Sequence, residues 1–207
     1  YKAFPNLEWI IVRQHGFDNV NLEECEKRGI GVVNTKPFAQ STADWINQYI
    51  EDTDRLALIG YGAIGRKVKH TNYVEIVGRH GRISDEVNTI VVSVPPEGND
   101  YLIGSNLLSN FKGKLISVSR ASVLDTHALM KNIKNISHAY IDTLDSYFRE
   151  ELLTTGKVTY GKHTAFNHNF TYENNIEYFS DLEKTIKDCL DNKVEKPILP
   201  RGERITF

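Results

Sequence analysis

The apolar residues of this chain occur in short runs that alternate with segments of helical periodicity. Runs rich in valine, isoleucine and leucine, bounded by glycine, proline or polar residues, predict β-strands. The predicted strands are Trp9–Arg13, Gly31–Asn34, Leu56–Ile59, Val74–Val77, Thr89–Val94, Leu115–Ser119, Ala139–Leu144 and Val158–Gly161. Because strands and helical patterns alternate, the chain is expected to form βαβ units around a parallel sheet.

Four longer segments have polar and apolar residues at helical spacing. They are Asn21–Arg28, Ser41–Tyr49, Asp125–Ile133 and Tyr172–Asn192. Ser41 is expected to be an N-cap, with Asp44 completing a start that resembles a capping box. Residues 51–54 form a charged junction, the expected domain boundary, and no regular structure is expected for residues 193–207.

Composition and charge narrow the classes of partner. The 207 residues are 40% hydrophobic and 25% charged, with a formal net charge of −2. This gives no reason to expect nucleic acid or a membrane as partner, and no run approaches the roughly 18 apolar residues of a membrane span. Cys25 and Cys189 are far apart, which favours two reduced thiols in a cytoplasmic protein over one disulfide. The first residue is Tyr1 rather than Met, so we expect the natural beginning to be missing.

A glycine-rich turn follows the apolar run Leu56–Ile59. Gly60, Gly62 and Gly65 have the spacing of the dinucleotide-binding fingerprint, and Ala63–Val68 is expected to open a helix. In that motif the first glycine permits the tight turn, the second lets the backbone approach a pyrophosphate, and the third lets helix and strand pack closely. A nucleotide site is therefore favoured over a purely structural turn.

A series of short motifs follows along the chain. They are Pro5–Trp9, His15–Val20, Lys27–Ile30, Ser41–Asp44, the glycine turn, Ile116–Arg120 with Val123–Asp125, Ala139–Asp142 and Gly161–Ala165. In this order, over residues 4–195, they resemble the D-isomer-specific 2-hydroxyacid dehydrogenase family. The resemblance implies an α/β fold, a Rossmann-type doubly wound parallel sheet with a smaller, incomplete flavodoxin-like substrate lobe.

The resemblance also implies a division into domains. Residues 1–50 would be a partial substrate-binding lobe, residues 51–165 the dinucleotide-binding domain, and residues 166–207 a C-terminal helix and tail returning to the substrate lobe. Relative to the family, the first strands of the lobe are missing. The segments after Gly65 and before Thr89 are short, which indicates either a reduced form of the fold or omitted segments.

Candidate catalytic residues come from the same resemblance. Arg120 lies at the expected end of a strand, where its guanidinium can hold a carboxylate in bidentate geometry. His163 suits proton transfer because histidine titrates near neutral pH; His168 is a rival. The alternative is that both residues belong to ordinary surface loops. His15 and Gly16 resemble the loop that binds the substrate carboxylate.

The sequence departs from the family at the carboxylate that normally supports the histidine. The family has a glutamate five residues after the aspartate that corresponds to Asp142, and here that position is Tyr147. Asp145 is the substitute we expect, because a carboxylate holds the imidazole in one tautomer. If no carboxylate reaches His163, the enzyme would be slow or inactive.

A second departure concerns the coenzyme. The resemblance implies cofactor contacts at Gly60, Tyr61, Gly62, Ala63, Ile64, Gly65, Arg79, His80, Val94, Pro95, Ser119 and Asp142. Members that bind NAD usually have an acidic residue after the second strand, which bonds the ribose hydroxyl groups. Here the strand ending at Val77 is followed by Gly78, Arg79 and His80. Since Arg79 can pair with a 2′-phosphate, NADP is favoured over NAD.

The function expected is therefore an NAD(P)-dependent oxidoreductase that transfers hydride between nicotinamide and a 2-oxo acid/D-2-hydroxy acid pair, as a reductase of the glyoxylate or hydroxypyruvate type. The alternative is a catalytically weak nucleotide-binding or regulatory protein on the same fold. A short-chain reductase is disfavoured because its tyrosine–lysine pattern is lacking. The resemblance also implies a homodimer, and no metal site is expected.

Overall fold

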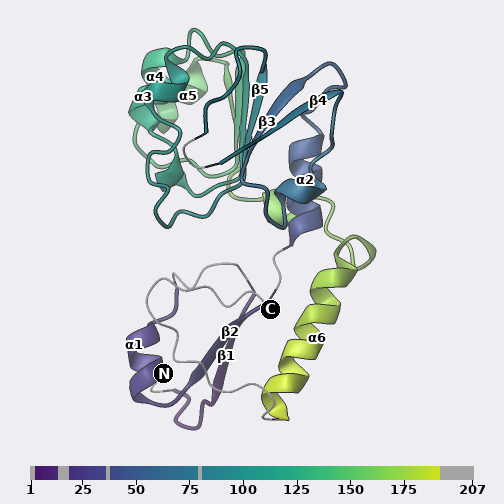
Figure 1. Ribbon diagram of the computed structural model, residues 1–207. Coiled ribbons are helices and arrows are strands. Elements are labelled where there is room, and N and C mark those ends of the chain that lie inside the picture. Colours follow the sequence, from purple (N-terminus) through teal and green to yellow (C-terminus); the bar gives the residue numbers. More distant parts are fainter. Residues whose placement is uncertain (1–2, 14–18, 36–37, 79–80, 192–207) are drawn as a thin grey trace. The chain divides into compact units, whose positions relative to one another are not determined.

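The computed structural model describes residues 3–13, 19–35, 38–78 and 81–191 (Figure 1). The chain divides into two compact units, Tyr1–Phe38 with Thr171–Phe207, and Ala39–Phe170. The larger unit therefore includes residues 39–50, which the family resemblance assigns to the substrate lobe. The physical reason is that Trp45, Ile46 and Ile50 are buried in a cluster with residues of the larger unit's sheet.

Six parallel strands form the sheet of the larger unit, in the order β4-β3-β5-β6-β7-β8. Their bounds are β3 Arg55–Ile59, β4 Tyr73–Val77, β5 Thr89–Val92, β6 Lys114–Ser117, β7 His138–Ile141 and β8 Val158–Tyr160. The chain passes from β3 to β4 on one side and then returns to β5 on the other. The strand order thus reverses between β3 and β5, the position at which doubly wound sheets bind nucleotides. The expected parallel doubly wound fold is confirmed.

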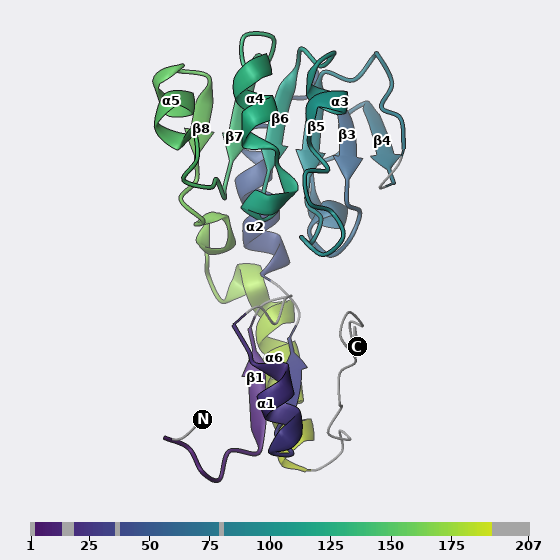
Figure 2. The ribbon, with the colours of Figure 1, turned by 90° about the vertical axis from the view of Figure 1, so that its left-hand side faces the viewer.

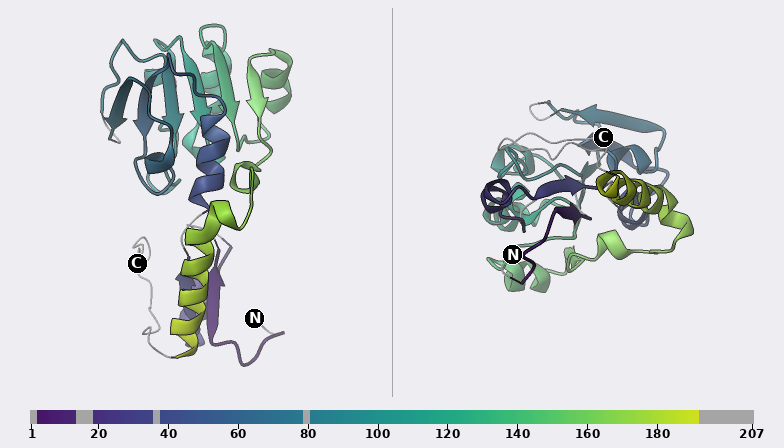
Figure 3. Two further views of the ribbon diagram at one scale, coloured as in Figure 1. Left: turned by 90° about the vertical axis from the view of Figure 1, so that its right-hand side faces the viewer. Right: turned by 90° about the horizontal axis from the view of Figure 1, so that it is seen from below.

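Helices cover both faces of this sheet (Figures 2 and 3). Along β3, Ala57 and Ile59 pack in one buried cluster and Leu56 and Leu58 in the other, as the two-residue period of a strand requires. The first cluster is covered by α3 Ser105–Leu108, α4 Thr126–Asn132 and α5 Arg149–Thr154; the second is covered by α2 Ala39–Asn47 and the 3₁₀ turn Ala165–Asn167. Burying each such leucine or isoleucine contributes about 1.5–3 kcal/mol.

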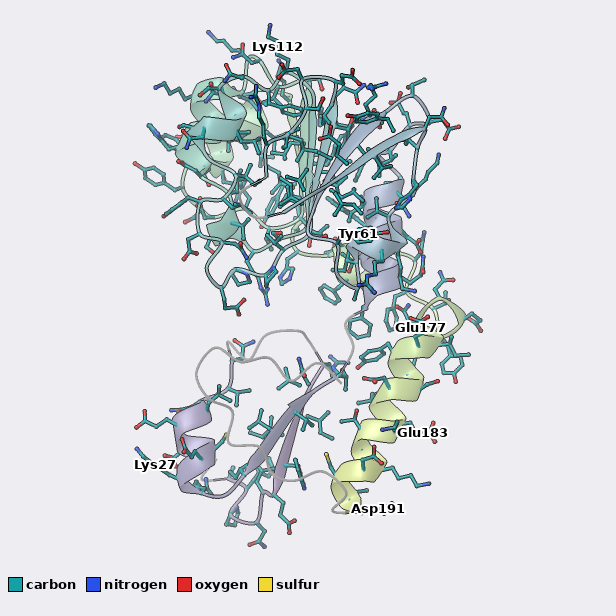
Figure 4. The ribbon with its side chains drawn as sticks, in the orientation of Figure 1. Lys27, Tyr61, Lys112, Glu177, Glu183 and Asp191 are labelled. Atoms are coloured by element: carbon teal, nitrogen blue, oxygen red, sulfur yellow. The ribbon has the colours of Figure 1, made fainter. Side chains whose placement is uncertain are left out.

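The smaller unit contains the parallel strands β1 Trp9–Val12 and β2 Gly31–Asn34 and the helices α1 Leu22–Lys27 and α6 Ile176–Leu190. Asn21 caps α1, because its side chain accepts a hydrogen bond from the backbone N–H of Glu24 at 3.0 Å. On α6, Tyr178 is buried whereas Glu177 and Glu183 are exposed (Figure 4). None of the helices in the described ranges is long and apolar enough to cross a membrane.

Two predicted helix starts are wrong. Helix α2 begins at Ala39, so Ser41 lies inside the helix and is buried rather than acting as its N-cap. Asp44 instead accepts a hydrogen bond from the Gln40 side chain at 2.9 Å. After the glycine turn the expected helix is only the 3₁₀ turn Gly65–Lys67, since Val68 already has extended backbone. Residues 193–207 lie outside the described residues.

Candidate active site

The carboxyl ends of the parallel strands lie along one edge of the sheet and are joined by hydrogen bonds. The Ser93 hydroxyl, just beyond β5, donates to the carbonyl of Gly60 beyond β3 at 2.8 Å. The backbone N–H of Val94 donates to the Ser119 hydroxyl beyond β6 at 2.9 Å. These two hydrogen bonds connect the glycine turn, through the residues that follow β5, to the segment before Arg120. Parallel sheets place ligand sites at this edge.

The glycine turn has the geometry that a dinucleotide requires. Gly60 has φ +98°, a conformation that side chains rarely adopt. A Cβ at Gly65 would lie 2.1 Å from the Gly60 carbonyl oxygen, so this position must stay bare for the turn to close. A Cβ at Gly62 would meet nothing within 4 Å, which leaves open space beside the backbone. The three glycines therefore match the three roles of the fingerprint.

This turn offers backbone rather than side-chain groups for binding a ligand. Tyr61 and Ile64 pack against the buried cluster on the α2 face of the sheet, and Ala63 is exposed (Tyr61 is labelled in Figure 4). Within the described part of the chain, the N–H groups of Gly62 and Ala63 make no hydrogen bond. The residues of the turn thus fit a pyrophosphate, although a 3₁₀ turn replaces the long helix whose dipole would add to binding.

Arg120 and His163 meet at the same edge. Arg120 follows β6 and His163 follows β8, and Arg120 Nη1 lies 3.2 Å from His163 Nε2. A guanidinium has donors only, so a hydrogen bond in this contact requires Nε2 of His163 to be the acceptor. The structure therefore brings together the two residues that the sequence singles out for carboxylate binding and proton transfer.

The loop that carries His163 has an uncommon backbone conformation. Lys162 and His163 have φ values of +54° and +58°, in the left-handed region. Such residues cost free energy and cluster at functional sites. The Phe166 ring packs edge-on against the His163 ring, with 5.7 Å between centroids, and is 44% exposed. The sequence pattern did not reveal Phe166; its only signal was its position three residues after the histidine.

Asp142 is a buried carboxylate beside this loop. It is 3% exposed, and burial raises its pKa, while hydrogen bonds from the Ala165 and Thr164 backbone and the charges of His163 and Arg120 oppose the rise. Its backbone N–H donates to the Ser117 carbonyl at 2.9 Å, which joins β7 to the strand that precedes Arg120.

Asp145 is engaged elsewhere. One carboxylate oxygen accepts from the Thr126 hydroxyl at 2.9 Å, and the other accepts from the backbone N–H of Tyr147 at 2.9 Å. Among the described residues, the ring of His163 is hydrogen-bonded to Arg120 and to no carboxylate. The structure thus does not bring the expected substitute carboxylate to the histidine. His168, the other histidine that the sequence offers for proton transfer, follows the 3₁₀ turn Ala165–Asn167. Its backbone N–H donates to the Ala165 carbonyl.

A cavity of about 440 Å³ lies at the carboxyl end of β4. It is lined by Glu75–Gly78 and Gly81–Ser84, and Arg82 gives it a cation. The pKa of the Glu75 carboxyl is lowered, chiefly because it accepts a hydrogen bond from the Tyr73 hydroxyl. The cavity lining therefore also carries an anion. The sequence pattern did not select Arg82.

Four of the predicted site residues lie outside the described residues: His15, Gly16, Arg79 and His80. Pro95 is described, and its carbonyl accepts a hydrogen bond from the Asn99 side chain at 2.7 Å.

Fold and site together define a dinucleotide-binding α/β protein of the Rossmann class, with an arginine–histidine pair at the edge that carries its glycine turn. Residues 1–193 match the catalytic domain of the D-isomer specific 2-hydroxyacid dehydrogenases, and the chain belongs to this family. It is accordingly an NAD(P)-dependent oxidoreductase of the 2-hydroxy acid/2-oxo acid class, as the motif order predicted.

Individual relatives are distant in sequence. The chain is 24% identical to the glyoxylate reductase of Thermococcus kodakarensis, over 79% of this chain and 68% of the relative. Its fold is similar to an acyclic imino acid reductase solved with NADPH and D-Arg (TM-score 0.73, 20% identity, 93% of this chain and 79% of that one). It is also similar to the NADPH-dependent glyoxylate/hydroxypyruvate reductase of Sinorhizobium meliloti solved with citrate (TM-score 0.72, 21% identity, 98% and 82%).

Proposed function

We propose that this protein is an NADPH-preferring reductase of a small 2-oxo acid of the glyoxylate or hydroxypyruvate type. The observation that carries the proposal is the contact between Arg120 and His163 at the sheet edge that bears the glycine turn. The relatives named as glyoxylate reductases support the substrate class. We include Gly60–Gly65, Val94, Pro95 and Ser119 among the residues that contact the coenzyme, which supplies the hydride when bound. Asp142, which is buried, is assigned to the histidine loop instead.

The two side chains have complementary tasks in this reaction. Arg120 would hold the substrate carboxylate and polarise the carbonyl, because its planar fork matches a carboxylate. His163 would donate a proton to the carbonyl oxygen. A protonated imidazole has no lone pair at Nε2 and cannot accept from Arg120, so the observed contact must break when the histidine is charged. Substrate would then be bound between two cations.

Turnover of NADPH with glyoxylate and hydroxypyruvate, followed by absorbance, tests this function. General acid–base catalysis contributes about 10²–10⁴-fold, so His163→Ala should lower kcat by that range. Arg120→Ala should raise KM for the 2-oxo acid as well as lower kcat. His168→Ala is the matched control and should retain wild-type turnover. Loss in His168→Ala with retention in His163→Ala would reverse the assignment.

Preference for NADPH is proposed from the wall of the β4 cavity. No acidic residue follows Val77 directly, and Arg82 lines the cavity where a ribose 2′-phosphate would be met. A hydrogen bond to a charged group is worth about 1.5–3 kcal/mol, so Arg82→Ala should reduce the NADPH-to-NADH ratio of kcat/KM by about 10–100-fold. Lys112→Ala removes an equal charge before β6, at the amino end of the strands, and should leave this ratio unchanged (Figure 4).

A second candidate function is nucleotide binding without appreciable catalysis. Two observations favour it: His163 has no hydrogen-bonded carboxylate among the described residues, and a 3₁₀ turn replaces the helix after Gly65. Tight NADPH binding in titration, with no turnover of any 2-oxo acid, would support this function over the first.

We also propose a cytoplasmic homodimer. The family resemblance supports the dimer, and neither Cys25 nor Cys189 is in a disulfide, which suits a reducing compartment. Light scattering coupled to size-exclusion chromatography measures the oligomeric state directly; a monomeric mass would contradict the dimer.

A further inference from the structure

Three consecutive backbone N–H groups donate to one residue, Asp142. The His163 N–H donates to its carbonyl oxygen at 2.7 Å. The N–H groups of Thr164 and Ala165 donate to its side-chain oxygen Oδ1 at 2.9 and 3.0 Å. Because Asp142 is buried at the end of β7, these bonds attach the histidine loop to the sheet.

The loop needs such an attachment because its backbone is strained. Left-handed residues at Lys162 and His163 persist only where the surrounding structure holds them. The chain also approaches Asp142 closely, since a Cβ at Gly161 would lie 2.6 Å from Oδ1. Both the hydrogen bonds and the close approach therefore converge on one carboxylate oxygen.

Asp142 also interacts electrostatically with both members of the pair, whereas Asp145 is bound to Thr126 and Tyr147. We propose that Asp142 is the positioning residue of His163 and acts through the backbone of the histidine loop, where the family uses a glutamate side chain. This inference rests on the proposed function, because it assumes that His163 transfers the proton.

The substitutions Asp142→Ala and Asp142→Asn separate the parts of this role. Alanine removes the acceptor, so kcat should fall about 10–100-fold, the order expected when a reacting group is misplaced by about 1 Å. Asparagine keeps an acceptor oxygen for Thr164 and Ala165 and should restore most of kcat. Asp125→Ala is the matched control, since Asp125 likewise accepts a backbone N–H, from Ala128 at 2.8 Å, and should leave kcat unchanged.

Binding of NADPH distinguishes positioning from coenzyme contact. The Kd of NADPH should stay close to that of the wild type in Asp142→Ala, measured by fluorescence titration at a temperature where the variant is folded. Unchanged kcat, or a loss of NADPH affinity that accounts for the whole effect, would overturn the proposal. So would an Asp142→Asn variant as impaired as Asp142→Ala. If the alanine variant does not fold, Asp142→Ser, which keeps a shorter acceptor, takes its place with the same expectations.

A second readout does not depend on turnover. The ¹⁵N shifts of the His163 ring should report one tautomer, with Nε2 as acceptor, in the wild type and Asp142→Asn, and an average of tautomers in Asp142→Ala. If the wild type reduces no 2-oxo acid yet shows this pattern, the proposed function fails while the positioning role stands. Identical ring shifts in all three proteins would refute the positioning role.

Discussion

Replacing Gly65 by alanine is the sharpest test of the glycine turn. The new Cβ would lie 2.1 Å from the Gly60 carbonyl oxygen, far inside van der Waals contact, and the obstacle is backbone. Overpacking of this kind costs about 1–3 kcal/mol. The same oxygen accepts the hydrogen bond from Ser93, and its loss adds about 0.5–1.5 kcal/mol. We therefore expect Gly65→Ala to lower the free energy of unfolding by about 2–4 kcal/mol.

Gly62→Ala is the matched variant, which should leave the free energy of unfolding nearly unchanged but weaken the binding of NADPH. Its Cβ meets nothing within 4 Å, so the free energy of unfolding should change by less than about 0.5 kcal/mol. The added methyl would, however, occupy the open side of the turn, where a pyrophosphate would approach. Urea unfolding followed by circular dichroism, with fluorescence titration of NADPH, measures both quantities. Gly62→Ala should bind NADPH at least ten times more weakly while remaining as stable as wild type.

Two results would refute this account of the turn. Wild-type stability of Gly65→Ala would mean that the backbone at Gly60 moves aside at little cost. Wild-type affinity of Gly62→Ala for NADPH would mean that the coenzyme does not approach this side of the turn. The fingerprint would then be a structural turn, the alternative that the sequence leaves open.

Other consequences concern residues outside the site. Asp54→Ala should destabilise the protein by about 1.5–3 kcal/mol in urea unfolding, because Lys114, whose side chain is 14% exposed, loses a carboxylate at 2.9 Å while it keeps the Tyr49 carbonyl and Glu51 as partners. Lys27→Ala breaks an exposed pair with Glu23 and should cost under about 1 kcal/mol. Burial lowers the pKa of His138, so the folded state disfavours its charged form and stability is lost as pH falls through about 6.5. In His138→Gln, thermal unfolding scanned from neutral to mildly acidic pH should show a smaller loss; an identical slope would exclude His138 as the cause.

Elements defined by local pattern were predictable from the sequence. The apolar runs predict every strand of the parallel sheet. The helical patterns that begin at Asn21 and Asp125 are also formed, and each of these two side chains caps its helix by accepting an N–H three residues ahead. Family motifs select Arg120 and His163, which the structure brings into contact. These features depend on residues close in sequence or on the parallel order of strands.

Features set by chain length and by distant contacts were not predictable. Ala63–Val68 contains residues compatible with a helix, but only residues 60–72 connect β3 to β4. A parallel crossover takes a dozen or more residues, and the glycine turn uses the first of these, so little remains for a helix. Likewise, the bonds from Thr164 and Ala165 to Asp142 exist only because β7 and β8 are neighbours in the sheet.

Strand order explains why Asp142 interacts with both Arg120 and His163. Arg120 follows β6 and His163 follows β8, and β7 lies between these strands. Neighbouring strands are about 4.8 Å apart, so β6 and β8 are separated by roughly 10 Å and their side chains must reach toward each other across the end of β7. The residue at that end is Asp142. A buried acceptor at this position is what the strained loop of His163 requires. The glutamate of the family can therefore be absent without leaving the histidine loop unsupported.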